Sequence, residues 1–329
     1  MKAPLKISVI VIVYRMPRQA INTIYSLSAL HQRNIKEEEY EIIVVENRSE
    51  NMIDQQQLLA LGKNIRYFSR EESGHSPAAA INYGFSLCRA DYIGLLIDGA
   101  RMVTPRVLEY ALQAKSIDKN SIFAVPGYNL GAEKQHIDSH YSEEKEIRLL
   151  SKTNWQQNGY RLFDIANIGE ANPRGFFQPF MENNCLFSSL GSYENIGFAD
   201  ENFHFLGGGG LNLHMFRLLG TLANAPYLFV TPGEGSFHQY HGGVSTTPRA
   251  DREEILAPPR KQLVSYWGGD TFKALQREPF LLGAVNSHAQ KFLLYSSQRA
   301  LKRFERKTRN NEPFWPSDFK QKRYTEHFS

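Results

Sequence analysis

The 329-residue chain lacks the residues and the apolar runs that mark disulfide-stabilised and membrane-spanning proteins. Its only two cysteines, Cys88 and Cys185, lie in apolar surroundings, so we expect neither a disulfide framework nor a thiolate metal site. The longest strongly apolar run, residues 7–14, is far too short to cross a bilayer and begins too early for a signal peptide to precede it. These absences predict a cytoplasmic protein and leave peripheral contact with a membrane open.

A strong net charge is also missing, because 38 basic and 34 acidic residues give a formal net charge of +4 at pH 7. A charge this small does not indicate a nucleic-acid partner. The basic residues are nevertheless concentrated near the C-terminus: Arg299, Lys302, Arg303, Arg306, Lys307, Arg309, Lys320, Lys322 and Arg323. Such a run is usually a solvated face, and the alternative is a surface that docks on phosphate groups, such as an anionic membrane.

The first part of the chain alternates between apolar runs and amphipathic segments. The apolar runs predict strands, most of them buried on both faces, at residues 7–13, 40–45, 65–68, 92–97 and 122–125. Helices are predicted between them at residues 20–30, from Ser76 and Pro77 onward, and at residues 105–114. Strand, helix and strand in this order form right-handed βαβ units, so residues 1–126 predict an α/β half.

Asp98 directly follows the predicted strand at residues 92–97. Ligands of open α/β sheets bind outside the carboxyl ends of the strands, so an acid placed there can hold a metal ion or a sugar hydroxyl. Thr104 and Pro105 come next and predict the N-cap and the first turn of a helix. The alternative is that Asp98 only caps a turn, and this segment alone leaves both interpretations open.

Residues 127–180 mix aromatic and polar residues without a sustained period, which is typical of a substrate-binding insert. His136 and His140 are spaced like a metal pair on a helix, but no neighbouring residue supports such a site. A solvated helix face is therefore the favoured interpretation. Order returns at residues 181–187, and residues 228–230 predict another strand.

The last third of the chain begins with four consecutive glycines at residues 207–210, before an amphipathic helix predicted at residues 211–220. These glycines offer either an anion-binding cradle at the helix N-terminus or a flexible hinge. A loop with His238 and His241 is predicted at residues 237–246. Residues 251–329, rich in charge and proline at first, predict a basic, helical C-terminal extension.

Several of these segments, taken in order, resemble the family 2 glycosyltransferases, which have the GT-A fold. The resemblance covers about residues 5–250. It rests on the strand before Tyr14-Arg15, the strand ending in Glu46-Asn47, the turn and helix at residues 74–84, Asp98-Gly99-Ala100 in place of Asp-x-Asp, Gly197-Phe198-Ala199-Asp200-Glu201, and His241-Gly242-Gly243. It implies a mixed, mainly parallel α/β sheet flanked by helices, with a nucleotide-binding half at residues 1–126 and an acceptor-side half at residues 127–250.

The same resemblance implies a nucleotide-diphosphate sugar as the donor and a glycan or a lipid-linked molecule as the acceptor. A uracil-type base would stack near Tyr14 and hydrogen-bond to Glu46, while Asp98, Arg101 and His241 would hold the ribose and the diphosphate. The residues implied in donor binding are Val13, Tyr14, Arg15, Glu46, Ser76, Asn82, Asp98, Gly99 and Arg101.

One departure from the family concerns a metal ion. In such enzymes two acids and a distal histidine hold a divalent cation, Mn²⁺ or Mg²⁺, on the diphosphate. Ala100 replaces the second acid, so Asp98 remains with either His238 or His241, and we assign the metal to Asp98 and His241. Since the Arg101 guanidinium can pair with phosphate instead, we expect metal dependence to be weak or absent.

A second departure concerns the general base. The Glu-Asp pair that supplies it in inverting members corresponds here to Gly209 and Gly210. The titratable side chains nearby in sequence are Glu182, Asp200, Glu201 and His204. Glu182 and Asp200 are the predicted catalytic residues, Glu182 because such enzymes often line the acceptor pocket at this point. Helix capping is the favoured alternative for Asp200.

The predicted function is sugar transfer from a nucleotide-diphosphate sugar to an acceptor hydroxyl, with inversion, in glycan or polysaccharide synthesis. The alternative is a GT-A-like domain that binds a nucleotide sugar or a glycan without turnover, which the missing acid and the missing base both favour. A nucleotidyltransferase is less well supported. Its first strand is usually followed by a glycine-rich loop with Arg and Lys, and Tyr14-Arg15-Met16-Pro17 is not such a loop.

Overall fold

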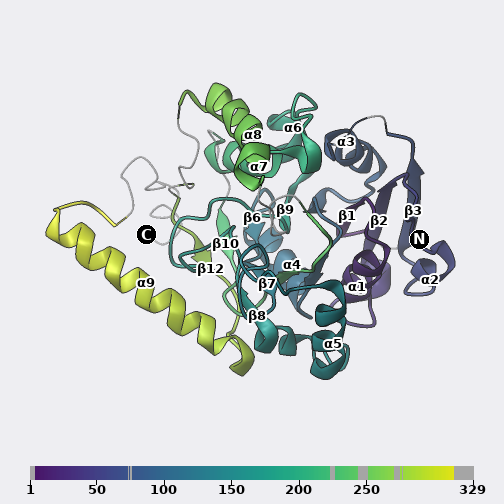
Figure 1. Cartoon of the computed structure of the whole chain (residues 1–329), viewed down its shortest axis with the longest axis horizontal. Helices are drawn as coiled ribbons and strands as arrows, with labels where there is room; N and C mark the ends of the chain where they lie inside the picture. The colour runs from purple at the N-terminus through teal and green to yellow at the C-terminus, as the bar shows by residue number, and fades with distance from the viewer. Residues whose placement is uncertain are drawn as a thin grey trace.

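The computed structural model describes residues 4–72, 74, 76–222, 227–243, 251–269, 275 and 277–314. In this part of the chain, the main sheet has eight strands (Figure 1), in the order β12 (Phe280–Leu281), β10 (Leu228–Val230), β6 (Ile122–Ala124), β9 (Leu186–Ser189), β4 (Tyr92–Leu96), β1 (Ile7–Val13), β2 (Tyr40–Asn47) and β3 (Ile65–Arg70). Of these eight, only β9 runs antiparallel to its neighbours. The prediction of a mainly parallel α/β sheet is therefore confirmed.

Helices cover both faces of this sheet because the strands are apolar on both faces. One buried core joins Val9 and Val11 of β1 to α1 (Pro17–Leu27), α2 (Gln55–Leu59) and α4 (Val107–Ile117). The other joins Ile10 and Ile12 to α3 (Ala78–Leu87), α6 (Leu190–Asn195) and α7 (Leu211–Thr221). Gly84 lets α3 approach the sheet closely, since a Cβ at this position would lie 2.6 Å from Ile10 Cγ2.

A second sheet, which the sequence analysis did not predict, stands beside the carboxyl ends of the main strands. Its four described strands are β5 (Arg101–Val103), β11 (Ser236–His238), β7 (Gly127–Leu130) and β8 (Ala166–Ile168), in this order. The loop predicted at residues 237–246 is wrong at its start, because β11 pairs with β5 and β7. Residues 127–180 are also more regular than predicted, since they contain β7, β8 and α5 (Glu143–Thr153).

The short strands of the second sheet depend on tertiary packing. Each has only three or four residues, too few to show an apolar period in the sequence. Their stability comes from a cluster of aromatic rings, in which Tyr128 lies 5.3 Å from Phe237 and 4.6 Å from Phe292 between ring centres. Phe292 belongs to the C-terminal part of the chain, so the sheet forms only after distant segments meet.

Several predicted helix boundaries shift for local reasons. Helix α4 begins at Val107 rather than Pro105, because Thr104 is used elsewhere: its hydroxyl accepts a hydrogen bond from Gly235 N (2.9 Å). Helix α3 begins just after Pro77, and α7 continues through Gly220 to Thr221. Shorter 3₁₀ turns lie at Glu37–Glu39, Gly159–Ile165, Leu206–Gly208 and Ser287–Ala289.

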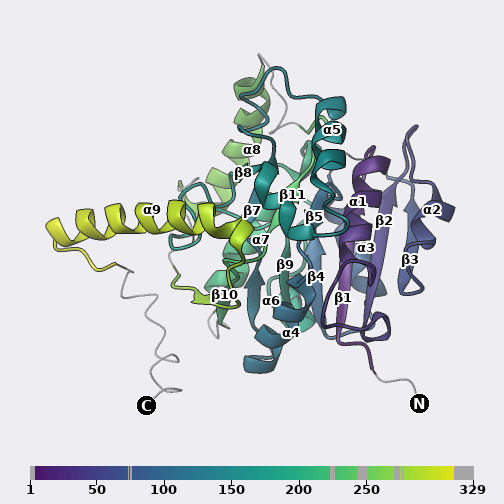
Figure 2. The same ribbon diagram turned by 90° about the horizontal axis from the view of Figure 1, so that it is seen from below.

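The described residues beyond 250 add two α-helices, one strand and the 3₁₀ turn Ser287–Ala289. Helix α8 (Arg252–Trp267) lies beside α7, and α9 (Gln290–Arg309) extends away from the rest of the molecule (Figures 1 and 2). Between them, β12 pairs with β10 at the edge of the main sheet. Leu263 and Phe292 are buried in the core that contains α7. Among the described helices, none combines the length and the apolar composition that a membrane crossing requires.

Candidate functional site

A cavity of about 660 Å³ lies at the carboxyl ends of β1, β2 and β4. Its polar side chains come from these strand ends, from the second sheet, from the segments before α3 and β9, and from helices α7 and α8: Tyr14, Arg15, Asn47, Ser76, Asp98, Arg101, Asn129, Glu170, Glu182, Asn184, Asn212, His238, His241, Arg252 and Arg260. The cavity therefore brings together segments that are more than 200 residues apart in sequence.

Asp98 stands at the centre of this cavity, and its two carboxylate oxygens have different partners. Oδ1 accepts a hydrogen bond from Ala100 N (2.9 Å) and so caps the turn between β4 and β5. Oδ2 faces His238 and His241. The turn is tight against β1, because a Cβ at Gly99 would lie 2.8 Å from the Ile12 carbonyl oxygen. The turn-capping interpretation of Asp98 therefore holds for Oδ1, and the ligand-binding role of this carboxylate stays a prediction.

Asp98, His238 and His241 form a cluster, hereafter the Asp-His-His cluster. His238 Nε2 lies 2.9 Å and His241 Nε2 lies 3.5 Å from Asp98 Oδ2, and the two ring nitrogens are 3.0 Å apart. The sequence analysis left His238 and His241 as alternatives, and the structure brings both to the acid. His238 is set in place by β11, the strand that the sequence did not reveal.

The hydrogen bonds of His238 fix its tautomer. The Gln135 amide nitrogen donates to the His238 backbone carbonyl (3.0 Å), so the amide oxygen is left to accept from His238 Nδ1 (3.1 Å). With its proton on Nδ1, His238 presents a lone pair on Nε2 toward Asp98.

The charges within the cluster follow from burial and proximity. Burial would raise the pKa of Asp98, but the two neighbouring imidazoles hold that pKa well below its usual range. Burial lowers the pKa of His238 to about 4, whereas Asp98 outweighs burial at His241 and raises that pKa. Asp98 is therefore ionised, and His241 is the more basic of the two imidazoles.

The three donor atoms of the Asp-His-His cluster suit a divalent cation. They lie within 4.8 Å of one another, and among the described residues this is the group of acids, histidines or cysteines that could hold a metal. A carboxylate oxygen and two imidazole nitrogens, with His238 oriented by Gln135, match the ligands of Mn²⁺ or Zn²⁺ better than the all-oxygen set preferred by Mg²⁺.

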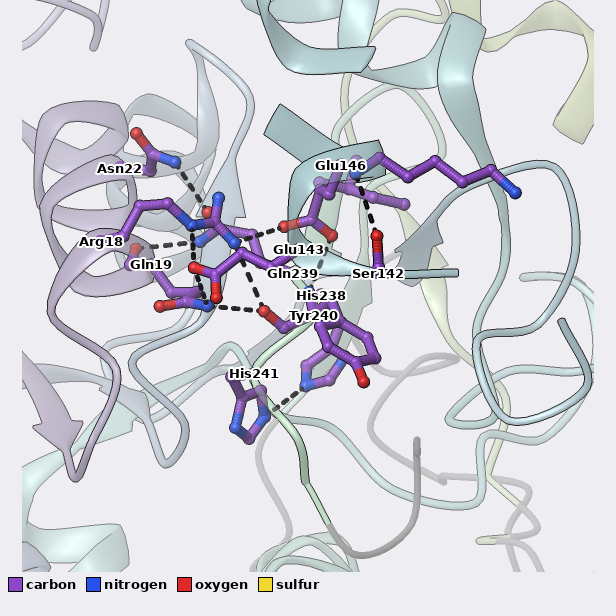
Figure 3. A network of polar contacts seen from close by, with 12 residues as sticks. Arg18, Gln19, Asn22, Ser142, Glu143, Glu146, His238, Gln239, Tyr240 and His241 are labelled. Carbon is purple, nitrogen blue, oxygen red and sulfur yellow. Dashed lines mark hydrogen bonds and ion pairs between the residues drawn. The ribbon is translucent and has the colours of Figure 1, made fainter. Parts of the chain in front are cut away.

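Buried polar contacts hold the segment that carries the two histidines (Figure 3). Glu146 of α5 is fully buried, accepts a hydrogen bond from Tyr240 N (2.7 Å) and forms an ion pair with Arg18 of α1 (2.9 Å). Gln19 of α1 donates to the Tyr240 carbonyl (2.6 Å). Helices α1 and α5 thus hold the backbone between His238 and His241 in place, which restricts movement of the two histidines away from Asp98.

Arg101 brings a positive charge to the part of the cavity beside Asp98. It is the first residue of β5, and its side chain is 13% exposed, with Nε 3.8 Å from Asp98 Oδ2. Nε is buried and has no hydrogen-bond partner within the described structure. A buried donor without a partner is costly, so this guanidinium is suited to an anionic ligand in the cavity.

Glu182 provides a further carboxylate in the cavity lining. Oε2 accepts a hydrogen bond from Asn212 Nδ2 (2.6 Å) at the start of α7. Burial raises the pKa of Glu182, and Arg101 opposes this effect. A carboxylate with a raised pKa that lines a cavity has the properties of a general base. Glu170, a second acid in the cavity, is instead paired with Lys134 (3.4 Å).

Asp200, the other predicted catalytic residue, has its contacts outside the cavity lining. Its carboxylate accepts hydrogen bonds from Asn202 N (2.9 Å) and from the Tyr266 hydroxyl of α8 (2.7 Å). Glu201 accepts from Asn82 Nδ2 (2.9 Å), and Asn82 Oδ1 accepts from Ala199 N. These contacts fix the turn at residues 199–201 to α3 and α8.

The predicted nucleoside-binding residues divide into two groups. Tyr14, Arg15 and Ser76 line the cavity, and the Arg15 guanidinium lies 5.0 Å from the centre of the Tyr14 ring. Val13 and Glu46 are fully buried.

Glu46 is occupied by internal contacts. Its carboxylate accepts from the Tyr67 hydroxyl (2.7 Å) and from Ile53 N, and burial raises its pKa. Asn47, the next residue, lines the cavity instead. The sequence analysis quoted Asn47 only as part of the strand ending, although alternation along β2 places consecutive residues on opposite sides.

The glycine run at residues 207–210 serves packing. A Cβ at Gly210 would lie 2.4 Å from Leu263 Cγ of α8, and one at Gly209 would lie 3.2 Å from Pro259 Cβ. The positions that correspond to the family's Glu-Asp pair are therefore where α8 approaches the cavity. At the other sequence candidate, His136 and His140, the expected helix is absent, since residues 134–140 form turns.

The fold and the site together define an α/β protein with a polar cavity at the carboxyl edge of its sheet. The family model described as glycosyl transferase family 2 matches residues 8–175, slightly more than half of the chain. The chain belongs to this family of glycosyltransferases. A search among curated proteins found no match.

Solved structures similar to this chain include those of TarS from S. aureus. The TarS structure has 11% sequence identity and a TM-score of 0.45, over 90% of this chain and 44% of that one. The complex of TarS residues 1–349 with UDP-GlcNAc has 12% identity and a TM-score of 0.42, over 91% of this chain and 73% of that one. The chain thus spans less than half of the TarS chain in the first of these structures.

Proposed function

We propose that the chain transfers a sugar from a nucleotide-diphosphate donor to an acceptor hydroxyl, with inversion at the anomeric carbon. The observation that carries this proposal is the arrangement of the cavity. We assign the Asp-His-His cluster and Arg101, whose buried Nε has no hydrogen-bond partner among the described residues, to the donor side, and the Glu182 carboxylate, with its raised pKa, to the acceptor side. One side suits a diphosphate and the other suits a hydroxyl that must lose its proton.

In this proposal the donor lies along the carboxyl ends of β1, β2 and β4. The base stacks on Tyr14 and meets the Asn47 side chain, while Arg15 neutralises charge beside it. Arg101 pairs with the diphosphate, whose negative charge increases as the sugar leaves. Glu46, buried beneath this surface, supports the strand end rather than contacting the base.

Glu182 acts as the general base. The acceptor hydroxyl attacks the anomeric carbon from the side opposite the diphosphate and gives its proton to Glu182 as the carbon–oxygen bond to the diphosphate breaks. A single displacement of this kind inverts the anomeric carbon. Asn212 and Asn184 hold the carboxylate at the acceptor side. With Glu182 as the general base, the reaction does not need an acidic side chain at position 209 or 210.

Asp98, His238 and His241 would hold a divalent cation, which would neutralise diphosphate charge when bound. Three ligand atoms form an adequate set without the second acid of the family motif, because His238 supplies the ligand that Ala100 cannot. With three ligand atoms available, we infer that activity depends on a metal ion more strongly than the replacement of the second acid by Ala100 predicts.

A protein that binds a nucleotide sugar without turnover is the second candidate, favoured by Ala100 and by the glycines at positions 209 and 210. Calorimetric binding of a nucleotide-sugar panel that begins with UDP-GlcNAc, followed by assays of donor hydrolysis, separates the two. Binding with hydrolysis that chelators abolish and Mn²⁺ restores supports the transferase. Binding without hydrolysis of any donor supports the second candidate, and absence of binding contradicts both.

The exposed surface of α9 suits peripheral contact with an anionic membrane. Leu294, Leu301 and Phe304 are 61%, 58% and 55% exposed on this helix. The basic side chains of α9 near its C-terminal end are Arg299, Lys302, Arg306, Lys307 and Arg309. An amphipathic helix with basic flanks that extends from the body can bury its apolar residues at a lipid surface (Figure 2).

Liposome sedimentation tests this surface. The full chain should pellet with vesicles that contain phosphatidylserine and remain in solution with neutral vesicles. A Leu301→Asp, Phe304→Asp variant should lose most of that binding, whereas Ile117→Asp, at an exposed residue of α4, should retain it. Equal pelleting of both variants would contradict membrane contact by α9.

A further inference from the structure

Helix α8 contributes Arg252 and Arg260 to the cavity lining, but one part of this lining is apolar. It is formed by Leu206 before the glycines, by Leu213 of α7 and by four residues of α8: Ile255, Leu256, Pro259 and Leu263. These six residues, hereafter the apolar wall, come from two helices that lie side by side (Figure 1) and from the segment that enters α7.

Much of the apolar wall is open to the cavity rather than packed into the core. Leu263 is buried, whereas Ile255, Leu256 and Pro259 are half-buried and Leu206 is 51% exposed. Apolar side chains gathered along an accessible cavity indicate a ligand with an apolar part, because water gains nothing from contact with them.

The apolar wall is continuous with the proposed base. Asn212, which donates to Glu182 Oε2 (2.6 Å), directly precedes Leu213 in α7. An acceptor whose hydroxyl reaches Glu182 therefore has the remainder of its structure beside α7 and α8. The lining beside Asp98 and Arg101 is more polar, and its apolar residues are Ile12, Met16 and Ile97.

The glycine run is what allows α8 to take this position. Side chains at Gly209 and Gly210 would collide with Pro259 and Leu263. Consecutive glycines here bring an apolar helix face to the cavity at the positions where the family has its acids. The loss of those acids and the presence of the apolar wall are thus two aspects of one packing arrangement.

We propose that the acceptor carries a hydrocarbon group, which binds along the apolar wall while its hydroxyl faces Glu182. This inference rests on the proposed glycosyl transfer and specifies its acceptor class. A wholly polar glycan would leave the wall in contact with water, whereas a hydrocarbon chain would bury it. Each buried methylene contributes about 0.8 kcal/mol, so affinity should increase by up to about fourfold per methylene.

A series of n-alkyl β-D-glucosides, from hexyl to decyl and below their micelle concentrations, tests this class by calorimetric binding to the UDP-loaded wild type. Affinity should increase by about tenfold or more from hexyl to decyl. Leu256→Asp should remove most of this increase. Val264→Asp is the matched control, because Val264 lies on the same helix, is 38% exposed and is not part of the cavity lining.

Two results would overturn the proposal: affinity that does not depend on chain length in the wild type, or equal affinities for the Leu256 and Val264 variants. Leu256→Ser serves in the same assay if Leu256→Asp does not fold. Nucleotide binding and donor hydrolysis are measured on each preparation. Absence of both in the wild type would contradict the proposed function, whereas normal hydrolysis with chain-length-independent binding would contradict only the hydrocarbon acceptor.

Discussion

The donor side and the acceptor side of the cavity are built in different ways. The donor side stands on β1, β2 and β4, whose residues are buried along their whole length, and Asp98 follows from the end of such a strand. The acceptor side is assembled from the glycine run, α7 and α8, with Glu182 held by Asn212. The end of the main sheet fixes the positions of the charged side chains, and the packing of α7 against α8 determines the shape of the cavity beside them.

In the proposed mechanism, neighbouring side chains take over the roles of the two lost family motifs. On the donor side, His238 and Arg101 surround Asp98 where Ala100 cannot contribute. On the acceptor side, Glu182 stands near the space that the acids at positions 209 and 210 would have entered. The following variants test whether the two sides are as separate in function as they are in construction.

The largest effect is expected for Glu182→Gln, which removes the proposed base and preserves its shape. We expect kcat to fall by about 10²- to 10⁴-fold while nucleotide affinity stays unchanged. Because burial raises the pKa of Glu182 and the base acts when ionised, the wild-type rate should fall as the pH drops through that raised pKa.

The rate of Glu182→Gln should lack this acid limb. Glu201→Gln is the control, since Glu201 binds Asn82 at the turn outside the cavity and should leave the rate unchanged. A loss of nucleotide affinity in Glu182→Gln comparable to its loss of rate would show that the two sides are not separate.

A second test concerns Glu234, which lies between β10 and β11 and accepts hydrogen bonds from Arg106 N (3.1 Å) and from the Tyr160 hydroxyl (2.9 Å). Burial raises its pKa from 4.5 to about 7. A raised folded-state pKa means that the contribution to stability is complete below about pH 4.5 and is lost as the pH rises through 7.

The free energy of unfolding of Glu234→Gln, relative to the wild type, should therefore rise by about 3 kcal/mol between pH 4.5 and 8. Denaturant unfolding at several pH values measures it. Glu109→Gln is the contrasting variant, because the hydrogen bond from Arg106 lowers the pKa of Glu109 and its stabilisation is lost in acid instead. A pH-independent difference for Glu234→Gln would contradict the assignment.

The smallest effect is expected for Gly210→Ala. Its Cβ would lie 2.4 Å from Leu263 Cγ, so overpacking should cost about 1–3 kcal/mol in urea unfolding. Leu263→Ala in the same chain should recover part of that cost. Gly191→Ala is the control, since a Cβ there meets no atom within 4 Å. Unchanged stability in Gly210→Ala would show that the glycine run does not set the position of α8.

The same contrast explains what the sequence could predict. Long buried strands give continuous apolar runs in the sequence, so β1, β2 and β4 and the position of Asp98 at the end of β4 were predicted correctly. Both oxygens of Asp98 have uses that the sequence could offer only as alternatives. The second sheet was missed because its strands have three or four residues and depend on contacts with Phe292, far along the chain.

Site residues were missed for related reasons. Gln135, which fixes the His238 tautomer, has no sequence signal because its partner lies 103 residues away. The apolar wall could not be predicted from the sequence, because residues of α8 reach the cavity only through the close approach of α8 that Gly209 and Gly210 permit. The burial of Glu46, by contrast, could have been predicted from the sequence, because the four residues before it in β2, Ile42 to Val45, are all apolar.

The central claim is that Asp98 holds the donor's diphosphate through the Asp-His-His cluster and its cation. Calorimetric titration of UDP into the wild type and into Asp98→Asn, with and without Mn²⁺, tests this claim most directly. The amide oxygen that this substitution introduces can still accept from Ala100 N, and Asp91→Asn, which loses only an exposed contact with Lys115, serves as the control. Mn²⁺ should tighten UDP binding by about tenfold or more in the wild type and the control and have no effect in Asp98→Asn. Equal tightening in all three proteins would contradict the account.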